Sequence, residues 1–190
     1  MTNSGNHSGL FASSASRIQR FAAMLKETLP SVTLDPGRQV EVMGRMTPTL
    51  SNGSSVINLD CSIPDRFTAR TGVTATIFAR CDADFIRVST SVKKQSGERA
   101  MGTALNHAHP AYGELLAGRS YVGYATLFGT QYLTEYDPLK DARGQVIGAL
   151  YVGIDVSGER RVGVGVKIAS LCFAFTVLLL LAFTWHFAAR

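Results

Sequence analysis

An uninterrupted apolar segment near the C-terminal end constrains this chain more than any other feature. Residues Ile168–Phe187 read IASLCFAFTVLLLLAFTWHF and include no Asp, Glu, Lys or Arg. At a helical rise of about 1.5 Å per residue, the segment is long enough to span the roughly 30 Å hydrocarbon core of a bilayer. A buried helix of a globular core is a poor alternative, because the segment has no polar face. The sequence therefore predicts one transmembrane helix over residues 168–187.

The orientation of this span does not follow from charge, because basic residues flank both ends. Arg160, Arg161 and Lys167 precede it and Arg190 follows it. The first twenty or so residues contain no apolar stretch of signal-peptide length. Two interpretations stay open. Either the chain is truncated and a first membrane helix is missing, or the C-terminal helix is a tail anchor that leaves the preceding domain in the cytoplasm.

The segment before the domain predicts a tail and a helix. Residues 1–12 are rich in Ser, Asn and Gly, a composition typical of disorder. Residues 13–29 carry apolar side chains at helical spacing, among them Ile18, Leu25 and Leu29, with polar residues between them. We therefore expect a disordered tail followed by an amphipathic helix.

Residues 30–157 predict a domain built mainly of strands. Short β-prone pieces surround a hairpin signal at Asn52-Gly53, and short helices are expected over Asp65–Arg70 and after His109-Pro110. The longer strands are expected at Val73–Ala79, Phe85–Val92, Tyr121–Leu127, Gln131–Tyr136 and Val146–Val156. Short connections imply antiparallel pairing. The expected class is α+β, with one antiparallel sheet and helices on its faces.

Composition and motifs exclude several functions. The 19 basic and 14 acidic residues are scattered, so nucleic-acid binding is not expected. No zinc spacing and no hydrolase motif occurs, and His107 with His109 reads as a solvent-exposed loop pair. We expect no catalytic residues, no metal and no cofactor. Cys61 and Cys81 can pair in an oxidising compartment, although two separate thiols is the favoured interpretation.

Four segments of the chain resemble a known family. They are TGVTATIFARCDADFIRVSTSV (Thr71–Val92), GERAMGTAL (Gly97–Leu105), PAYGELLAGRSYVGYATLFGTQYLTEYDP (Pro110–Pro138) and GQVIGALYVGID (Gly144–Asp155). Together they resemble the Cache superfamily, in the Cache 3/Cache 2 fusion type of sensor domain of methyl-accepting chemotaxis proteins, with relatives in diguanylate cyclases and histidine kinases. The similarity covers roughly residues 30–156.

The resemblance implies a fold and a function. The implied fold is a PAS-like antiparallel sheet with a long N-terminal helix and a small-molecule pocket on the opposite face, its last strand leading to the membrane helix. The implied protein is the sensing part of a bacterial inner-membrane receptor, a non-enzyme with a periplasmic sensor domain. Its implied ligand is an organic acid or amino acid, and it is expected to form a homodimer. A truncated membrane protein that binds a receptor partner and senses nothing is the alternative.

Candidate ligand-binding residues include two arginines. Strand alternation over Phe85–Val92 places Arg87, Ser89 and Ser91 on one face. The planar guanidinium of an arginine donates two parallel hydrogen bonds to a carboxylate or phosphate, so Arg87 is the first candidate. The alternative for Arg87 is an exposed side chain or an ion pair. Arg99 lies in a segment that resembles the rim of the family's pocket and is the second candidate.

Tyrosines complete the candidate site. Tyr112, Tyr121 and Tyr132 lie in or near the expected strands and can line the mouth of a pocket, since a tyrosine offers both an apolar ring and a hydroxyl. Ordinary half-buried strand tyrosines are the alternative interpretation for each of them.

Overall fold

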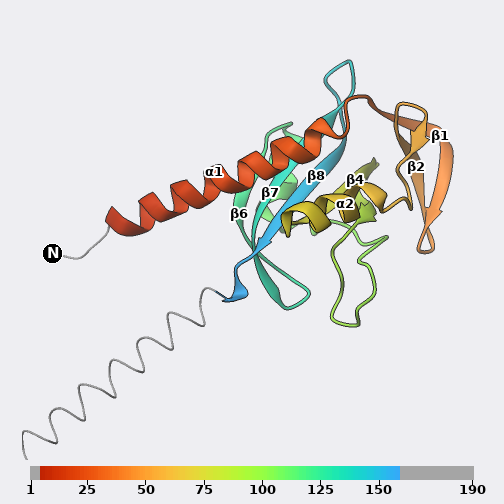
Figure 1. Cartoon of the computed structure of the whole chain (residues 1–190). Coiled ribbons are helices and arrows are strands. Elements are labelled where there is room, and N and C mark those ends of the chain that lie inside the picture. The colour runs from red at the N-terminus through yellow and green to blue at the C-terminus, as the bar shows by residue number, and fades with distance from the viewer. Residues whose placement is uncertain (1–4, 159–190) are drawn as a thin grey trace, which may run out of the picture. The chain divides into compact units, whose positions relative to one another are not determined.

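The computed structural model describes residues 5–158 and has a five-stranded antiparallel sheet at its centre, in the order β5-β4-β8-β7-β6 (Figure 1). Strand β8, the last strand within residues 5–158, therefore lies in the middle of the sheet, between two hairpins. The strands are β4 (Thr74–Cys81), β5 (Asp84–Thr90), β6 (Tyr121–Leu127), β7 (Thr130–Lys140) and β8 (Val146–Asp155). The antiparallel pairing and the five longer strands agree with the expectation from the sequence.

Two helices cover one face of this sheet. Helix α1 (Gly5–Glu27) contacts β7 and β8, and helix α2 (Ser62–Thr71) contacts β4 and β5 (Figure 1). Ile18 and Leu25 of α1 are fully buried, which explains the helical spacing of apolar residues seen in the sequence. Helix α1 begins within the segment for which disorder was expected, and it ends before Leu29. Gly72 ends α2 in the left-handed conformation.

The opposite face of the sheet holds an apolar cluster. Helix α3 (Pro110–Leu116) buries Ala111 and Leu115 there, against Phe78 of β4 and the fully buried Tyr136 of β7. The loop between β5 and α3 closes the same side with Ala100 and Leu105. This face, with α3 and its preceding loop, carries the candidate site described below.

The sequence predicted a single antiparallel sheet, which is wrong, because the described residues form two sheets. Strands β1 (Val32–Val42), β2 (Arg45–Asn52) and β3 (Ser55–Val56) form a separate antiparallel sheet. The β2–β3 connection turns at Gly53, as the Asn-Gly signal predicted. These strands were read as short β-prone pieces because a register shift between Asp35 and Gln39 interrupts the alternation of β1.

The predicted transmembrane helix over residues 168–187 lies outside the described residues. Within residues 5–158, no helix is long and apolar enough to cross a bilayer. Cys61 and Cys81 are both free thiols.

Candidate functional site

A β-bulge in β5 decides which polar side chains face α3. Arg87 pairs with Phe78 and Ser89 pairs with Ile77, so Val88 between them is an extra residue without a partner on β4. The extra residue reverses the alternation, because neighbouring strand residues point to opposite faces. The predicted common face of Arg87, Ser89 and Ser91 is therefore wrong. Arg87 points to the α3 side, whereas Ser89 and Ser91 belong to the α2 side.

Arg87 is buried without an acidic partner in the part of the chain that the structure describes. Its side chain is 4% exposed, and its guanidinium carbon lies 4.9 Å from the centre of the Phe78 ring. One terminal nitrogen donates a hydrogen bond to Thr103 Oγ1 at 2.8 Å, while the buried Nε has no acceptor within the described residues. Burial lowers the pKa of Arg87, and no carboxylate opposes that effect. A buried guanidinium of this kind is an unsatisfied donor for an anion.

Tyr136 brings a second unsatisfied donor to the same place. Its side chain is fully buried, and its hydroxyl has no hydrogen-bond partner among residues 5–158. Burial raises the pKa of Tyr136 to about 12, so the hydroxyl keeps its proton and remains a donor at neutral pH. Tyr136 and Arg87 line the same cavity.

This cavity, which we call the Arg87 cavity, measures about 470 Å³. It lies between β5, the loop before α3 and the β6–β7 hairpin. Its other polar lining residues include Thr103 and His109, together with Asn106 and Thr126, and its apolar lining includes Leu105, Leu127 and Phe128. A buried guanidinium beside a mostly apolar wall suits a small organic anion.

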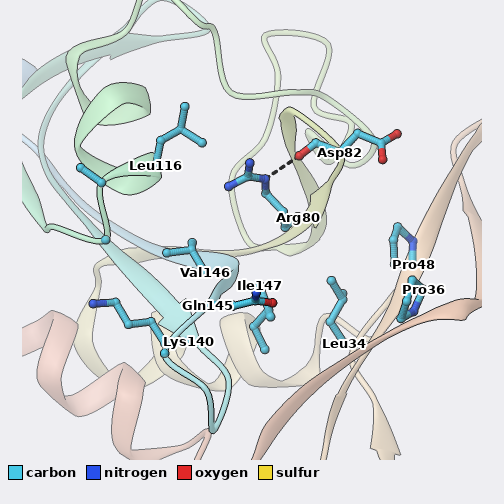
Figure 2. Close-up of a pocket in the computed structure, with 13 residues that line it drawn as sticks. Leu34, Pro36, Pro48, Arg80, Asp82, Leu116, Lys140, Gln145, Val146 and Ile147 are labelled. Carbon is cyan, nitrogen blue, oxygen red and sulfur yellow. Dashed lines mark hydrogen bonds between the residues drawn. The ribbon is translucent and has the colours of Figure 1, made fainter.

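A second, larger cavity is less suited to binding an anion than the Arg87 cavity. It measures about 610 Å³ and contains Arg80 and Lys140 at its edges (Figure 2). Arg80 Nε already donates a hydrogen bond to the carbonyl of Asp82 at 2.6 Å, and Lys140 is exposed. Because water solvates these cations, a ligand gains less from pairing with them than from pairing with Arg87.

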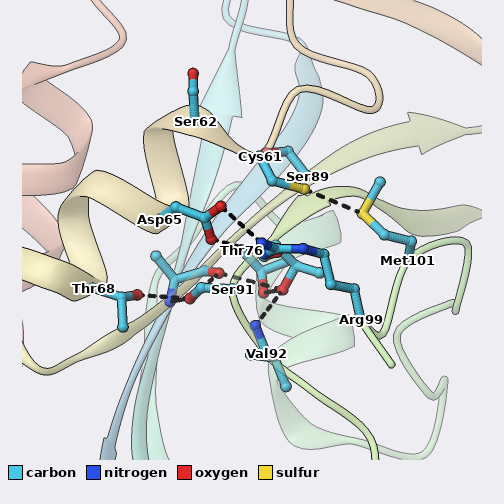
Figure 3. A network of polar contacts seen from close by, with 12 residues as sticks. Cys61, Ser62, Asp65, Thr68, Thr76, Ser89, Ser91, Val92, Arg99 and Met101 are labelled. Carbon is cyan, nitrogen blue, oxygen red and sulfur yellow. Dashed lines mark hydrogen bonds and ion pairs between the residues drawn. The ribbon is translucent and has the colours of Figure 1, made fainter. Parts of the chain in front are cut away.

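Arg99, the second predicted cation, has a partner within the fold. Its two terminal nitrogens donate to the two carboxylate oxygens of Asp65 on α2, both at 2.8 Å (Figure 3). One of them also donates to the Thr90 carbonyl at 2.7 Å. The hydrogen bond to Asp65 raises the pKa of Arg99. Arg99 thus joins α2 to the edge of the sheet, and it does not line the Arg87 cavity.

The two predicted serines also hold elements together. Ser91 Oγ accepts hydrogen bonds from Thr68 Oγ1 at 2.7 Å and from the Ala75 amide at 2.9 Å (Figure 3). Ser89 Oγ donates to the Asp60 carbonyl at 2.6 Å. Both hydroxyls are occupied on the α2 side of the sheet.

The three predicted tyrosines occupy different places. Tyr112 stacks on His107 with ring centres 4.2 Å apart and donates to the Ala83 carbonyl at 2.8 Å. Tyr121 packs against His109 and Tyr136, which places its ring next to the Arg87 cavity. Tyr132 pairs with Asp155 near the end of β8, and burial raises its pKa. Tyr112 touches the lining residue His109 through its backbone amide, whereas Tyr121 packs its ring against two residues that line this cavity.

Sequence reasoning missed His109. It was interpreted as solvent-exposed, yet it is half-buried, lines the Arg87 cavity and contacts Tyr136 with ring centres 5.2 Å apart. The signal was present in the sequence, because Pro110 marks the first residue of a helix and His109 is then its N-cap. Thr103 was missed as well, since only the folded loop brings it to Arg87.

Comparison with known protein families identifies the domain to which the described fold corresponds. The model of the Cache 3/Cache 2 fusion domain matches residues 10–161 of the chain. Among curated proteins, none shows significant sequence similarity to it.

Proposed function

The chain belongs to the Cache 3/Cache 2 fusion domain family, whose members are small-molecule sensing modules, and we propose that it senses a small organic anion in the Arg87 cavity. The observation that carries this proposal is the buried guanidinium of Arg87, which lines the cavity, donates one hydrogen bond to Thr103 and has no acidic partner among residues 5–158. A carboxylate supplies both a hydrogen-bond acceptor and a negative charge to the guanidinium of Arg87. Tyr136 lines the same cavity and forms part of its wall.

The proposed setting is a bacterial transmembrane receptor of the chemotaxis type. The support is the apolar segment over residues 168–187, which begins shortly after β8 ends at Asp155. In this setting the domain is periplasmic, the receptor is a homodimer in the inner membrane, and the domain performs no catalysis. A diguanylate cyclase or histidine kinase receptor remains the alternative, because the same sensing module serves all three classes.

We propose a route for the signal that uses β7 and β8. Tyr136 on β7 lies 5.1 Å, between ring centres, from Tyr151 on the central strand β8. Helix α1 packs on the other face of the same two strands. A ligand that binds one arrangement of these strands better than another shifts the population toward it, by no more than the difference in affinity. The end of β8 then carries the change toward the predicted membrane helix.

Calorimetric titration of the full chain in a mild detergent tests the proposal. A panel of small carboxylates, including propionate and lactate, is compared with propionamide, which has the shape of propionate without its charge. We expect saturable binding of at least one carboxylate and none of propionamide. Arg87→Met should abolish the binding, whereas Arg119→Met, at an exposed arginine paired with Glu114, should preserve it. Equal binding by Arg87→Met would refute the assignment.

A further inference from the structure

The ring of His109 is held in one orientation by the start of α3. Its Nδ1 accepts a hydrogen bond from the Ala111 amide at 3.1 Å, and its own amide donates to the Asn106 carbonyl at 2.9 Å. The following residue is Pro110, which has no amide hydrogen to compete for Nδ1. His109 is therefore the N-cap of α3 through its imidazole ring.

This orientation fixes the position of the ring proton. A neutral imidazole carries one proton, and because Nδ1 accepts a hydrogen bond, the proton is on Nε2. Burial, followed by the charge of Arg87, lowers the pKa of His109, so the neutral form persists at neutral pH. No partner for Nε2–H exists among residues 5–158, and Nε2 is not sealed from solvent. Because His109 is one of the residues that line the Arg87 cavity, its ring brings a neutral donor to this site.

The charge of the cavity limits the ligand that it can hold. Among its lining residues, Arg87 is the one with a formal charge when His109 is neutral. A single negative charge on the ligand is matched by this guanidinium. A second negative charge enters a partly apolar site without a partner, which costs free energy.

We propose that His109 is the second ligand-binding residue of the site, and that the neutral His109 and the cationic Arg87 together select a monocarboxylate over a dianion. This inference rests on the proposed function and specifies its ligand class. One carboxylate oxygen accepts from the guanidinium and the other accepts from His109 Nε2–H. Since the same ring caps α3, the bound carboxylate also orders the first turn of that helix.

Two substitutions separate binding from capping. His109→Asn keeps a side-chain acceptor at the position of Nδ1, since asparagine is a good N-cap, but it removes Nε2–H. We expect α3 and the melting temperature to be preserved, while the affinity for the best-binding carboxylate of the panel falls at least about tenfold. His107→Asn is the matched control, because His107 pairs with Asp84 outside the cavity and should leave the affinity unchanged.

The second measurement compares the affinities of the wild-type chain for different anions and needs no variant. The wild-type chain is titrated with propionate, succinate and inorganic phosphate at pH 8, and we expect propionate to bind at least about tenfold more tightly than either dianion. Nitrogen NMR of the wild-type histidines adds a direct readout. The His109 Nε2 resonance should show a protonated Nε2 and should shift on addition of propionate.

The outcomes distinguish the two proposals. If no small anion binds the wild-type chain, the proposed function fails. If Arg87-dependent binding is found but succinate or phosphate binds as tightly as propionate, the selectivity inferred here is overturned. If His109→Asn binds normally and the Nε2 resonance does not shift, the role of His109 in binding is overturned while the function of Arg87 stands. These NMR and selectivity results decide the question even where His109→Asn fails to fold.

Discussion

The guanidinium of Arg87 lies over the ring of Phe78, its direct partner on the neighbouring strand, at 4.9 Å from the ring centre. This contact and the hydrogen bond to Thr103 hold the side chain in place without neutralising its charge. The aromatic face stabilises a cation but accepts no conventional hydrogen bond from Nε. Arg87 is therefore held at the wall of the Arg87 cavity with its charge not neutralised by the residues around it.

Arg87→Lys should weaken carboxylate binding even though it conserves the charge. A lysine ammonium is a point charge on a flexible stem, so it cannot contact Thr103, stack on Phe78 and donate to the ligand together. We expect an affinity loss of at least about tenfold by calorimetric titration. Arg119→Lys is the control at a solvent-exposed position. Unchanged affinity in Arg87→Lys would mean that the anion needs only a nearby positive charge.

Arg99→Gln should lower stability without changing ligand affinity. The substitution removes both hydrogen bonds to Asp65 and the one to the Thr90 carbonyl, which join α2 to the sheet. The pair is partly exposed and screened by water, so we expect a cost of about 0.5–1.5 kcal/mol in urea unfolding. A double-mutant cycle with Asp65→Asn measures the coupling. A large loss of ligand affinity would instead place Arg99 in the binding site.

Glu135→Gln should stabilise the protein at alkaline pH. Glu135 is 5% exposed, and burial, followed by the charge of Asp137, raises its pKa from 4.5 to about 7. The folded state then holds a proton that the unfolded state releases between these pH values, so stability falls as pH rises through this window. The full difference is at most about 3 kcal/mol.

Urea unfolding at pH 5 and pH 8 checks this prediction. The wild-type chain should lose more stability between the two pH values than Glu135→Gln does. Glu98→Gln is the control, because the Glu98 side chain is 73% exposed. Parallel pH profiles for the wild type and Glu135→Gln would show that Glu135 ionises normally in the folded state.

Gly148→Ala should be strongly destabilising. A Cβ atom at Gly148 would collide with the backbone carbonyl oxygen of Phe78 in the centre of the sheet, where neither strand can move away. We expect a loss of about 2 kcal/mol or more in urea unfolding. Gly113→Ala is the matched comparison, since nothing lies within 4 Å of its added Cβ and alanine favours the helix. A mild effect of Gly148→Ala would indicate that β4 and β8 separate easily.

Local patterns were sufficient for much of the fold. The predicted strand Tyr121–Leu127 coincides with β6, and the turn at Gly53 and the helix near Asp65–Arg70 occur where the sequence placed them. These features depend on residues close together in the chain. The second sheet was missed because the shift within β1 breaks the period on which strand prediction depends.

By itself, the sequence determined the antiparallel strand pattern, the apolar C-terminal segment and the choice of Arg87 as the first binding candidate. Only the tertiary structure decided which polar residues share a cavity with Arg87. The bulge at Val88 places Ser89 and Ser91 on the α2 side of the sheet. Arg99 forms its ion pair with Asp65, 34 residues away in the chain. The N-cap position at the start of α3 places His109 at the cavity. The physical reason is that a bulge and a long-range ion pair depend on how neighbouring elements pack, which periodicity along one segment does not encode.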